Sequence, residues 1–207
     1  DLLSFAKKGA ELICVGKADG LHLKEQRAIN RLLYEKSQEG RQGKNVVRLK
    51  GGDPLIFSRG IEEALYLKKK GVDLEVVAGI TSAFAAPQSF GIPLTRKGKY
   101  SSVAVLTGRK SSGAPIDAPA CDTLVYLMAV ANIRNVVAAV LRSGKDKKTP
   151  CAFVESGTTQ DERIVAGTLA NIVARAREHR VRPPAVFIVG PVVDYGRKIY
   201  GHKFKTR

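Results

Sequence analysis

Short apolar runs alternate along the chain with longer stretches in which apolar residues recur at helical spacing. Runs of β-branched and aliphatic residues that end at glycine or a polar cluster predict strands, whereas apolar residues three and four positions apart predict helices. In the first half, strands are expected at 12–15, 46–49 and 74–77, and helices at 24–38, 61–70 and 81–89. This alternation is typical of βαβ units on a parallel sheet.

The second half repeats the alternation after a polar stretch at 95–99. Strands are expected at 102–107, 123–128, 151–155 and 185–189, and helices at 132–143 and 168–179. We therefore expect the α/β fold class, with one α/β domain at 1–96 and a second at 97–207. Ligands are expected in the cleft between the two domains.

The charge balance adds an expectation about partners. The 207 residues include 35 Lys plus Arg and 19 Asp plus Glu, a formal net charge of +16. A positive field of this size attracts polyanions such as nucleic acid, anionic lipid or multi-carboxylate metabolites. A basic, solvated surface without a special partner is the alternative. Because the basic residues are spread along the chain, without stacking motifs or a concentrated basic helix, nucleic acid is the disfavoured partner.

Several other classes of protein are disfavoured by what the sequence lacks. No apolar run reaches the roughly eighteen residues that would span a membrane, and residues 1–8 do not form a signal peptide. Cys14, Cys121 and Cys151 are isolated, and the 3 histidines are scattered. We therefore expect reduced thiols in a cytoplasmic protein, without a metal site.

The sharpest local feature is the sequence Arg-Leu-Lys-Gly-Gly-Asp-Pro at 48–54, which ends a predicted strand. Open α/β sheets bind ligands at the carboxyl ends of their strands. Gly51 and Gly52 would let backbone amides approach a ligand, and Asp53 could accept hydrogen bonds from a ribose hydroxyl or an amine. An ordinary strand-to-helix turn would use the same residues, so both interpretations stay open.

Three further strand ends carry polar or small residues. Thr81 and Ser82 follow the strand at 74–77 and could equally be N-caps of the next helix. Met128 ends the strand at 123–128 and could equally be core packing. Gly157 lies in a turn after 151–155. Together with the Gly-Gly-Asp-Pro segment, these strand ends are expected to converge on one interdomain cleft.

Several multi-residue motifs occur in an order that resembles a known family. They are Val-Gly-Lys-Ala-Asp-Gly-Leu-His at 15–22, Val-Val-Arg-Leu-Lys-Gly-Gly-Asp-Pro at 46–54, Gly-Ile-Thr-Ser-Ala at 79–83, Gly-Ile-Pro-Leu-Thr at 91–95, Leu-Val-Tyr-Leu-Met at 124–128 and Glu-Ser-Gly-Thr at 155–158. Along nearly its whole length the chain resembles the tetrapyrrole methylase family. Within that family it is most similar to the members that methylate uroporphyrinogen III.

This resemblance implies a fold and an activity. It implies two α/β domains per subunit, a homodimer, and S-adenosyl-L-methionine as the methyl donor, released as S-adenosyl-L-homocysteine. The implied reaction is C-methylation of uroporphyrinogen III at C2 and C7 to precorrin-2, in porphyrin biosynthesis at the branch to sirohaem and cobalamin. Another precorrin methyltransferase is the alternative within the family, and a basic nucleic-acid-binding protein is the distant alternative outside it.

The resemblance also implies roles for individual residues. The donor-binding positions of the family correspond to Gly51, Gly52, Asp53, Ile56, Thr81, Ser82, Met128 and Gly157. Lys17 corresponds to a proposed proton donor, and Arg59 and Glu62 correspond to positions of substrate contact and catalysis. From the residues alone, Glu62 could equally be a first-turn carboxylate facing the helix dipole, and Arg59 a surface cation.

The chain departs from the family pattern mainly at its start. The family begins with a strand, a glycine-proline loop and a segment with a proposed Asp base, and the first residue of this chain corresponds to a position after them. We expect a fragment of a longer protein that has no turnover alone and whose 46–49 strand has an unpaired edge. Milder departures are Ser58, Ile61, Arg96 and Ala129.

Overall fold

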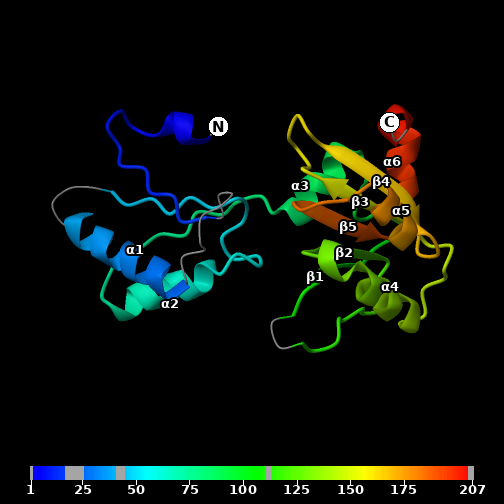
Figure 1. Cartoon of the computed structure of the whole chain (residues 1–207), viewed down its shortest axis with the longest axis horizontal. Helices are drawn as coiled ribbons and strands as arrows, with labels where there is room; N and C mark the ends of the chain where they lie inside the picture. The colour runs from blue at the N-terminus through cyan, green and yellow to red at the C-terminus, as the bar shows by residue number, and fades with distance from the viewer. Residues whose placement is uncertain (1, 17–25, 41–44, 111–112, 205–207) are drawn as a thin grey trace. The chain divides into compact units, whose positions relative to one another are not determined.

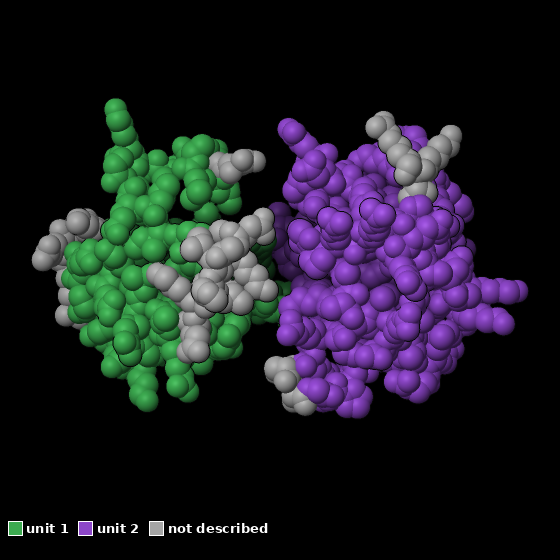
Figure 2. All heavy atoms as spheres, viewed as in Figure 1, with its two compact units in different colours: residues 1–78 green, residues 79–207 purple. Residues whose placement is uncertain are grey.

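The computed structural model describes residues 2–16, 26–40, 45–110 and 113–204 (Figure 1). The chain divides into two compact units, residues 1–78 and 79–207 (Figure 2). The sequence pattern placed the domain boundary after residue 96, whereas the compact units divide between residues 78 and 79. Helix α3 (Ser82–Ser89), Phe90 and Ile92 explain the difference, because their buried apolar side chains belong to a core of the second unit.

The first unit contains two longer helices within its described residues. The elements are the short 3-10 helix η1 (Leu2–Phe5) and the helices α1 (Gln26–Gly40) and α2 (Gly60–Lys69). Helices α1 and α2 pack against each other (Figure 1). Helix α2 carries glutamates in its first turn and lysines in its last, so these charges favour the helix dipole. After α2, Gly71 adopts a φ of 73°, which glycine tolerates without strain.

The strands expected in the first unit are not formed. Residues 12–15, 46–49 and 74–77 have no regular secondary structure, and no strand occurs within the described part of this unit. Side chains in these segments lie at the surface, including Val47 (80% exposed) and Val77 (73% exposed). An apolar run records a tendency to be buried, but a strand needs a neighbouring strand to share its backbone hydrogen bonds. Because residues 46–49 do not form a strand, the unpaired strand edge that was expected there is not found.

The second unit is built on a mixed sheet, which among the described residues has five strands in the order β1-β2-β5-β3-β4. The strands are β1 (Val103–Thr107), β2 (Thr123–Leu127), β3 (Pro150–Glu155), β4 (Arg163–Thr168) and β5 (Ala185–Val189). Strands β1 and β2 are parallel, whereas β5 is antiparallel to both of its neighbours, β2 and β3, and β4 is antiparallel to β3. The sequence pattern missed β4, whose apolar run Ile-Val-Ala is short, and it did not predict antiparallel pairing.

Helices cover both faces of this sheet, so alternate residues of one strand enter different cores. In β5, Phe187 and Val189 belong to one core, and Val186 and Ile188 belong to the other. The remaining elements are η2 (Val130–Asn132), α4 (Ile133–Arg142), α5 (Ile172–Glu178), α6 (Val193–Ile199) and η3 (Gly201–Phe204). Helices α4 and α5 supply the first core, and α3 and α6 supply the second. Burial of each large apolar side chain contributes about 1.5–3 kcal/mol, which fixes the strand ends firmly.

The structure also bears on membranes, metals and thiols. Within the described ranges, no helix is both long and apolar enough to cross a membrane. The same residues contain no group of three or more His, Cys, Asp and Glu that could hold a metal ion. Cys14, Cys121 and Cys151 are free cysteines. Burial raises the pKa of the Cys151 thiol, so this side chain is a protonated part of the core.

Candidate functional site

The glycine loop, Gly-Gly-Asp-Pro at 51–54, leads into α2 and packs against it. The Asp53 carboxylate accepts a hydrogen bond from the Leu55 amide at 2.8 Å, which forms a tight local turn. Gly60, the first residue of α2, lies so close to the loop that a Cβ on it would be 2.0 Å from the Pro54 carbonyl oxygen. The loop therefore rests directly on the start of α2, and a residue with a side chain would push it away.

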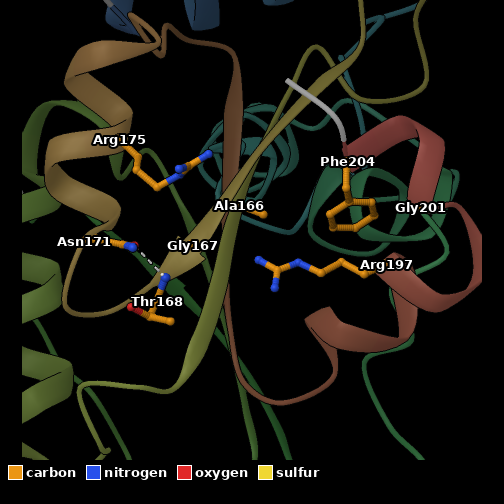
Figure 3. A pocket seen from close by; sticks show the side chains of 8 residues that line it. All are labelled: Ala166, Gly167, Thr168, Asn171, Arg175, Arg197, Gly201 and Phe204. Atoms are coloured by element: carbon orange, nitrogen blue, oxygen red, sulfur yellow. Dashed lines mark hydrogen bonds between the residues drawn. The ribbon is translucent and has the colours of Figure 1, made fainter. Parts of the chain in front are cut away.

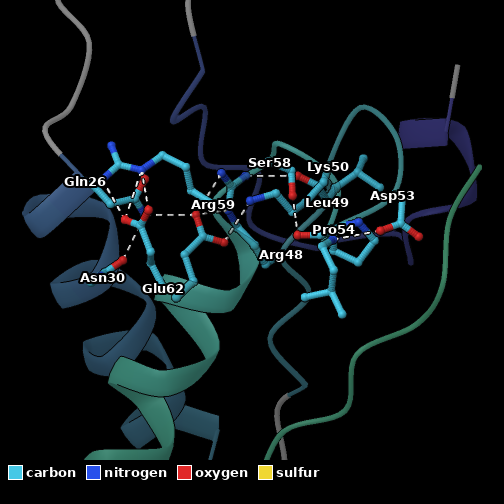
Figure 4. A network of polar contacts seen from close by, with 12 residues as sticks. Gln26, Asn30, Arg48, Leu49, Lys50, Asp53, Pro54, Ser58, Arg59 and Glu62 are labelled. Carbon is cyan, nitrogen blue, oxygen red and sulfur yellow. Dashed lines mark hydrogen bonds and ion pairs between the residues drawn. The ribbon is translucent and has the colours of Figure 1, made fainter. Parts of the chain in front are cut away.

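Arg59 and Glu62 form an exposed ion pair at the start of α2 (Figure 4). The Arg59 Nη2 donates to Glu62 Oε2 at 2.6 Å, and Nε donates to the same oxygen at 3.0 Å. This hydrogen bonding lowers the pKa of Glu62, so its carboxylate is ionised and engaged. Glu62 would become a better base only after the guanidinium moved to another anion.

Glu63, the next residue of α2, is a buried carboxylate that sequence reasoning missed as a site residue. The residue is 4% exposed, and its carboxylate accepts hydrogen bonds from Lys50 Nζ at 3.0 Å and from Gln26 Nε2 at 3.1 Å. Arg48 Nη2 lies 3.4 Å from Glu63 Oε1. Burial by itself raises the pKa of Glu63, but hydrogen bonds from Gln26 and Lys50 and the nearby Arg48 charge outweigh it and lower the pKa overall.

A signal for Glu63 was present in the sequence. Tyr66 and Leu67 follow it at helical spacing, three and four residues along, and both are partly buried on α2. This spacing places Glu63 on the inner face of the helix, whereas Glu62 is on the outer face. A glutamate on the inner face of a helix calls for buried cationic or hydrogen-bonding partners.

In the second unit, the carboxyl ends of β1, β2 and β3 lie at one edge of the sheet, because β5 is antiparallel to both β2 and β3. Met128 follows β2 with a φ of 58° and is 49% exposed, so it is not a core residue as the alternative held. Gly108 follows β1, where a Cβ would lie 2.5 Å from the Cα of Ala129. The Asn132 side chain donates to the Gly108 carbonyl at 3.1 Å and ties the two strand ends together.

Gly157 and α3 meet at the same edge. A Cβ on Gly157 would be 2.6 Å from the Cβ of Ala86 in α3, so the turn after β3 requires a glycine there. Thr81 is the N-cap of α3, and its Oγ1 accepts a hydrogen bond from the Ala83 amide at 3.3 Å. The N-cap role considered for Thr81 is thus present in the structure, and Ser82 beside it is exposed.

The predicted site residues fall into one set in each unit. Gly51, Gly52, Asp53, Ile56, Arg59 and Glu62 belong to the glycine loop and the start of α2. Thr81, Ser82, Met128 and Gly157 surround the sheet edge and α3 of the second unit. Lys17 lies outside the described residues. A separate cavity of about 470 Å³ in the second unit, beside Arg175, Arg197 and Phe204, contains none of these residues (Figure 3).

Comparison with known proteins defines the class to which this site belongs. Residues 2–173 match the model of the Tetrapyrrole (Corrin/Porphyrin) Methylases, and the chain belongs to this family. The chain is 46% identical over 200 residues to the uroporphyrinogen-III C-methyltransferase of Methanocaldococcus jannaschii. That alignment covers 94% of this chain and 81% of the relative.

Solved structures agree with this assignment. Uroporphyrin-III C-methyltransferase from Thermus thermophilus, in a complex with S-adenosyl homocysteine, superposes with a TM-score of 0.69 at 38% identity, over 82% of this chain and 74% of that chain. A cobalt precorrin-4 methyltransferase superposes with a TM-score of 0.78 at 27% identity, over 93% of this chain and 80% of that chain. Both neighbours are tetrapyrrole methylases, so the fold is that of the family.

Proposed function

We propose that this protein methylates uroporphyrinogen III at C2 and C7 with S-adenosyl-L-methionine as the donor, giving precorrin-2 for sirohaem and cobalamin formation. The observation that carries the proposal is the 46% identity over 94% of the chain to a uroporphyrinogen-III C-methyltransferase. A homodimer in the cytoplasm is part of the same proposal.

We assign donor binding to residues of both sets, and their chemistry fits the donor. The residues are Gly51, Gly52, Asp53, Ile56, Thr81, Ser82, Met128 and Gly157. Backbone amides of the glycine loop and the Asp53 carboxylate suit the polar groups of the donor, its amine and its ribose hydroxyls. Ile56 (42% exposed) and Met128 (49% exposed) are apolar surfaces that a bound adenine would cover.

The protein's own residues position the acceptor and remove a proton. When bound, S-adenosyl-L-methionine supplies a methyl group on sulfonium sulfur, which leaves as a thioether once a pyrrole carbon has attacked the methyl carbon. Arg59 presents a fork of N–H donors that matches a carboxylate of the macrocycle. As the guanidinium shifts to that carboxylate, Glu62 loses its partner and can accept the proton released from the alkylated ring. Lys17 is the proposed proton donor of this scheme.

The charge of the chain supports an acidic acceptor. Uroporphyrinogen III carries eight carboxylates, and a net charge of +16 raises the local concentration of such a polyanion. Nucleic acid is not part of the proposal, since no recognition element for it is apparent in the sequence.

The deciding experiment is a donor-dependent methylation assay of the full-length protein with uroporphyrinogen III, in which mass spectrometry counts the methyl groups added. We expect two additions, and none without donor. The TM-score of 0.78 to a cobalt precorrin-4 methyltransferase makes a later corrinoid intermediate the second candidate acceptor. Methylation of that intermediate but not of uroporphyrinogen III would favour the second candidate. Tight binding of DNA or RNA, without affinity for S-adenosyl-L-homocysteine, would contradict both candidate functions.

A further inference from the structure

The buried carboxylate of Glu63 occupies a particular place relative to the glycine loop. Lys50, which donates to Glu63 Oε2 at 3.0 Å, is the residue immediately before Gly51. At the other end of the loop, the Pro54 carbonyl accepts a hydrogen bond from the Ser58 hydroxyl and lies against Gly60. Both ends of the loop are therefore fastened to the first turn of α2 or to the residues that lead into it (Figure 4).

Glu63 also connects this arrangement to α1. Gln26, the first residue of α1, donates to Glu63 Oε1 at 3.1 Å and to Asn30 Oδ1 at 2.9 Å. Arg48 lies 3.4 Å from the same carboxylate oxygen and donates to the Leu49 carbonyl at 2.9 Å. The Glu63 carboxylate thus connects α2, on which it lies, with α1 and with the segment that precedes the glycine loop.

The charges make the connection dependent on an ionised Glu63. The side chain of Lys50 is 11% exposed and that of Glu63 is 6% exposed, so water screens this pair weakly. Loss of the negative charge would leave the buried ammonium of Lys50 without its carboxylate, and such a cation moves toward solvent or rearranges its surroundings. Because Lys50 adjoins Gly51, this movement would displace the amides of the loop.

We infer that Glu63 is a positioning residue for the methyl donor, which acts by holding Lys50 so that the loop at 51–54 keeps its donor-binding conformation. The inference rests on the proposed function, in which this loop binds S-adenosyl-L-methionine. Arg59 and Glu62 pair with each other through hydrogen bonds that do not involve Glu63. Glu63 therefore affects the donor more than the acceptor.

The test is calorimetric titration of S-adenosyl-L-homocysteine into the full-length wild type and the variant Glu63→Gln, which keeps the shape and removes the charge. We expect the donor Kd to rise about tenfold or more, as for a broken buried ion pair, while the acceptor KM changes less than about twofold. Equal donor affinity in wild type and variant would overturn the inference. A wild type without affinity for S-adenosyl-L-homocysteine would overturn the proposed function itself, and the inference with it.

A double-mutant cycle separates positioning from general damage. Lys50→Met breaks the same contact from the other side. We therefore expect a similar loss of donor affinity in Lys50→Met, in Glu63→Gln and in the double variant. Additive losses in the double variant would contradict action through Lys50. Asp122→Asn is the matched control, because Asp122 accepts hydrogen bonds from the amides of Ser101 and Ser102 in the second unit. This control should lower the thermal midpoint and leave the donor Kd unchanged. A raised donor Kd in the control would count against a specific role of Glu63.

Discussion

At the scale of single residues, two neighbouring glutamates of α2 have opposite surroundings. The side chain of Glu62 is 49% exposed and has Arg59 as its cationic partner, whereas the side chain of Glu63 is 6% exposed and has Lys50 and Arg48 beside it. An exposed pair exchanges partners readily, since each ion pair at a surface is worth no more than about 1 kcal/mol. The exposed glutamate suits a step in which charges move, and the buried one suits a fixed framework.

Arg59→Ala is expected to weaken acceptor binding or turnover more than donor binding. The change removes the guanidinium proposed to bind a substrate carboxylate, and it leaves the contacts of the glycine loop in place. Steady-state kinetics with both substrates would measure the split, with Arg177→Ala on α5 as a control that removes a cation far along the chain. Equal losses for donor and acceptor would point to a folding defect instead.

Asp53→Ala is expected to weaken the binding of S-adenosyl-L-homocysteine by about 1–3 kcal/mol, because hydrogen-bonding partners lose their acceptor. Asp53 also accepts from the Leu55 amide, so part of the loss would come through the shape of the turn. Asp53→Asn keeps an acceptor for that amide and isolates the contribution of the charge. Calorimetry that gives an unchanged affinity for Asp53→Ala would remove this residue from the site.

At the scale of elements, the glycine loop and the start of α2 behave as one unit. Gly60→Ala would place a Cβ against the Pro54 carbonyl, so we expect a loss of stability of about 1–3 kcal/mol together with weaker donor binding. Gly201→Ala in η3 is the control, because a Cβ there meets no atom within 4 Å. Chemical denaturation and calorimetry on the two variants would measure both effects, and similar behaviour of the two would exclude the close contact at Gly60.

The tie between α1, α2 and the residues before the glycine loop is expected to weaken in acid. The pKa of Glu63 is lowered from its ordinary value of 4.5, so the stability that it contributes is fully present above that value and is lost as the pH falls through the folded pKa. The difference in thermal midpoint between wild type and Glu63→Gln should therefore shrink below about pH 4.5. Glu39→Gln, which breaks an exposed pair with Lys36, is the control and should change the thermal midpoint only slightly at neutral pH. A difference in thermal midpoint between wild type and Glu63→Gln that grew in acid would contradict a stabilising role of the ionised Glu63.

Elements could be predicted from the sequence where burial alone decides them. Strands β1, β2, β3 and β5 are apolar runs, and the N-cap of α3 at Thr81 is a local signal. The position of β5 between β2 and β3 could not be predicted, because pairing depends on segments far apart in the chain. The same limit explains 46–49, whose apolar pattern predicted a strand that does not form, since no described segment pairs with these residues. Glu63 was missed because a first-turn glutamate usually faces water.

At the scale of the whole molecule, the charge of +16 should affect how the acceptor arrives. We expect kcat/KM for uroporphyrinogen III to fall as salt rises, since screening shortens the reach of the positive field to roughly 10 Å at 0.1 M. The donor, which carries little net charge, should show a much smaller dependence. Initial rates at several ionic strengths would measure this, and a flat acceptor profile would show that the basic surface plays no part in capture.

The central position of β5 has a consequence for how the chain folds while the ribosome synthesises it. Among the described residues, β1 and β2 form one pair and β3 and β4 form another, and β5, the last of these five strands along the chain, joins the two pairs. Isolated two-stranded pairs are marginally stable. At synthesis rates of about 5–20 residues per second, the first pair waits roughly 3–12 s and the second roughly 1–4 s with unprotected edges before Ala185–Val189 is complete. The sheet of the second unit is therefore expected to form only after β5 has been made, and chaperones that bind exposed strand edges should engage the nascent chain during that interval.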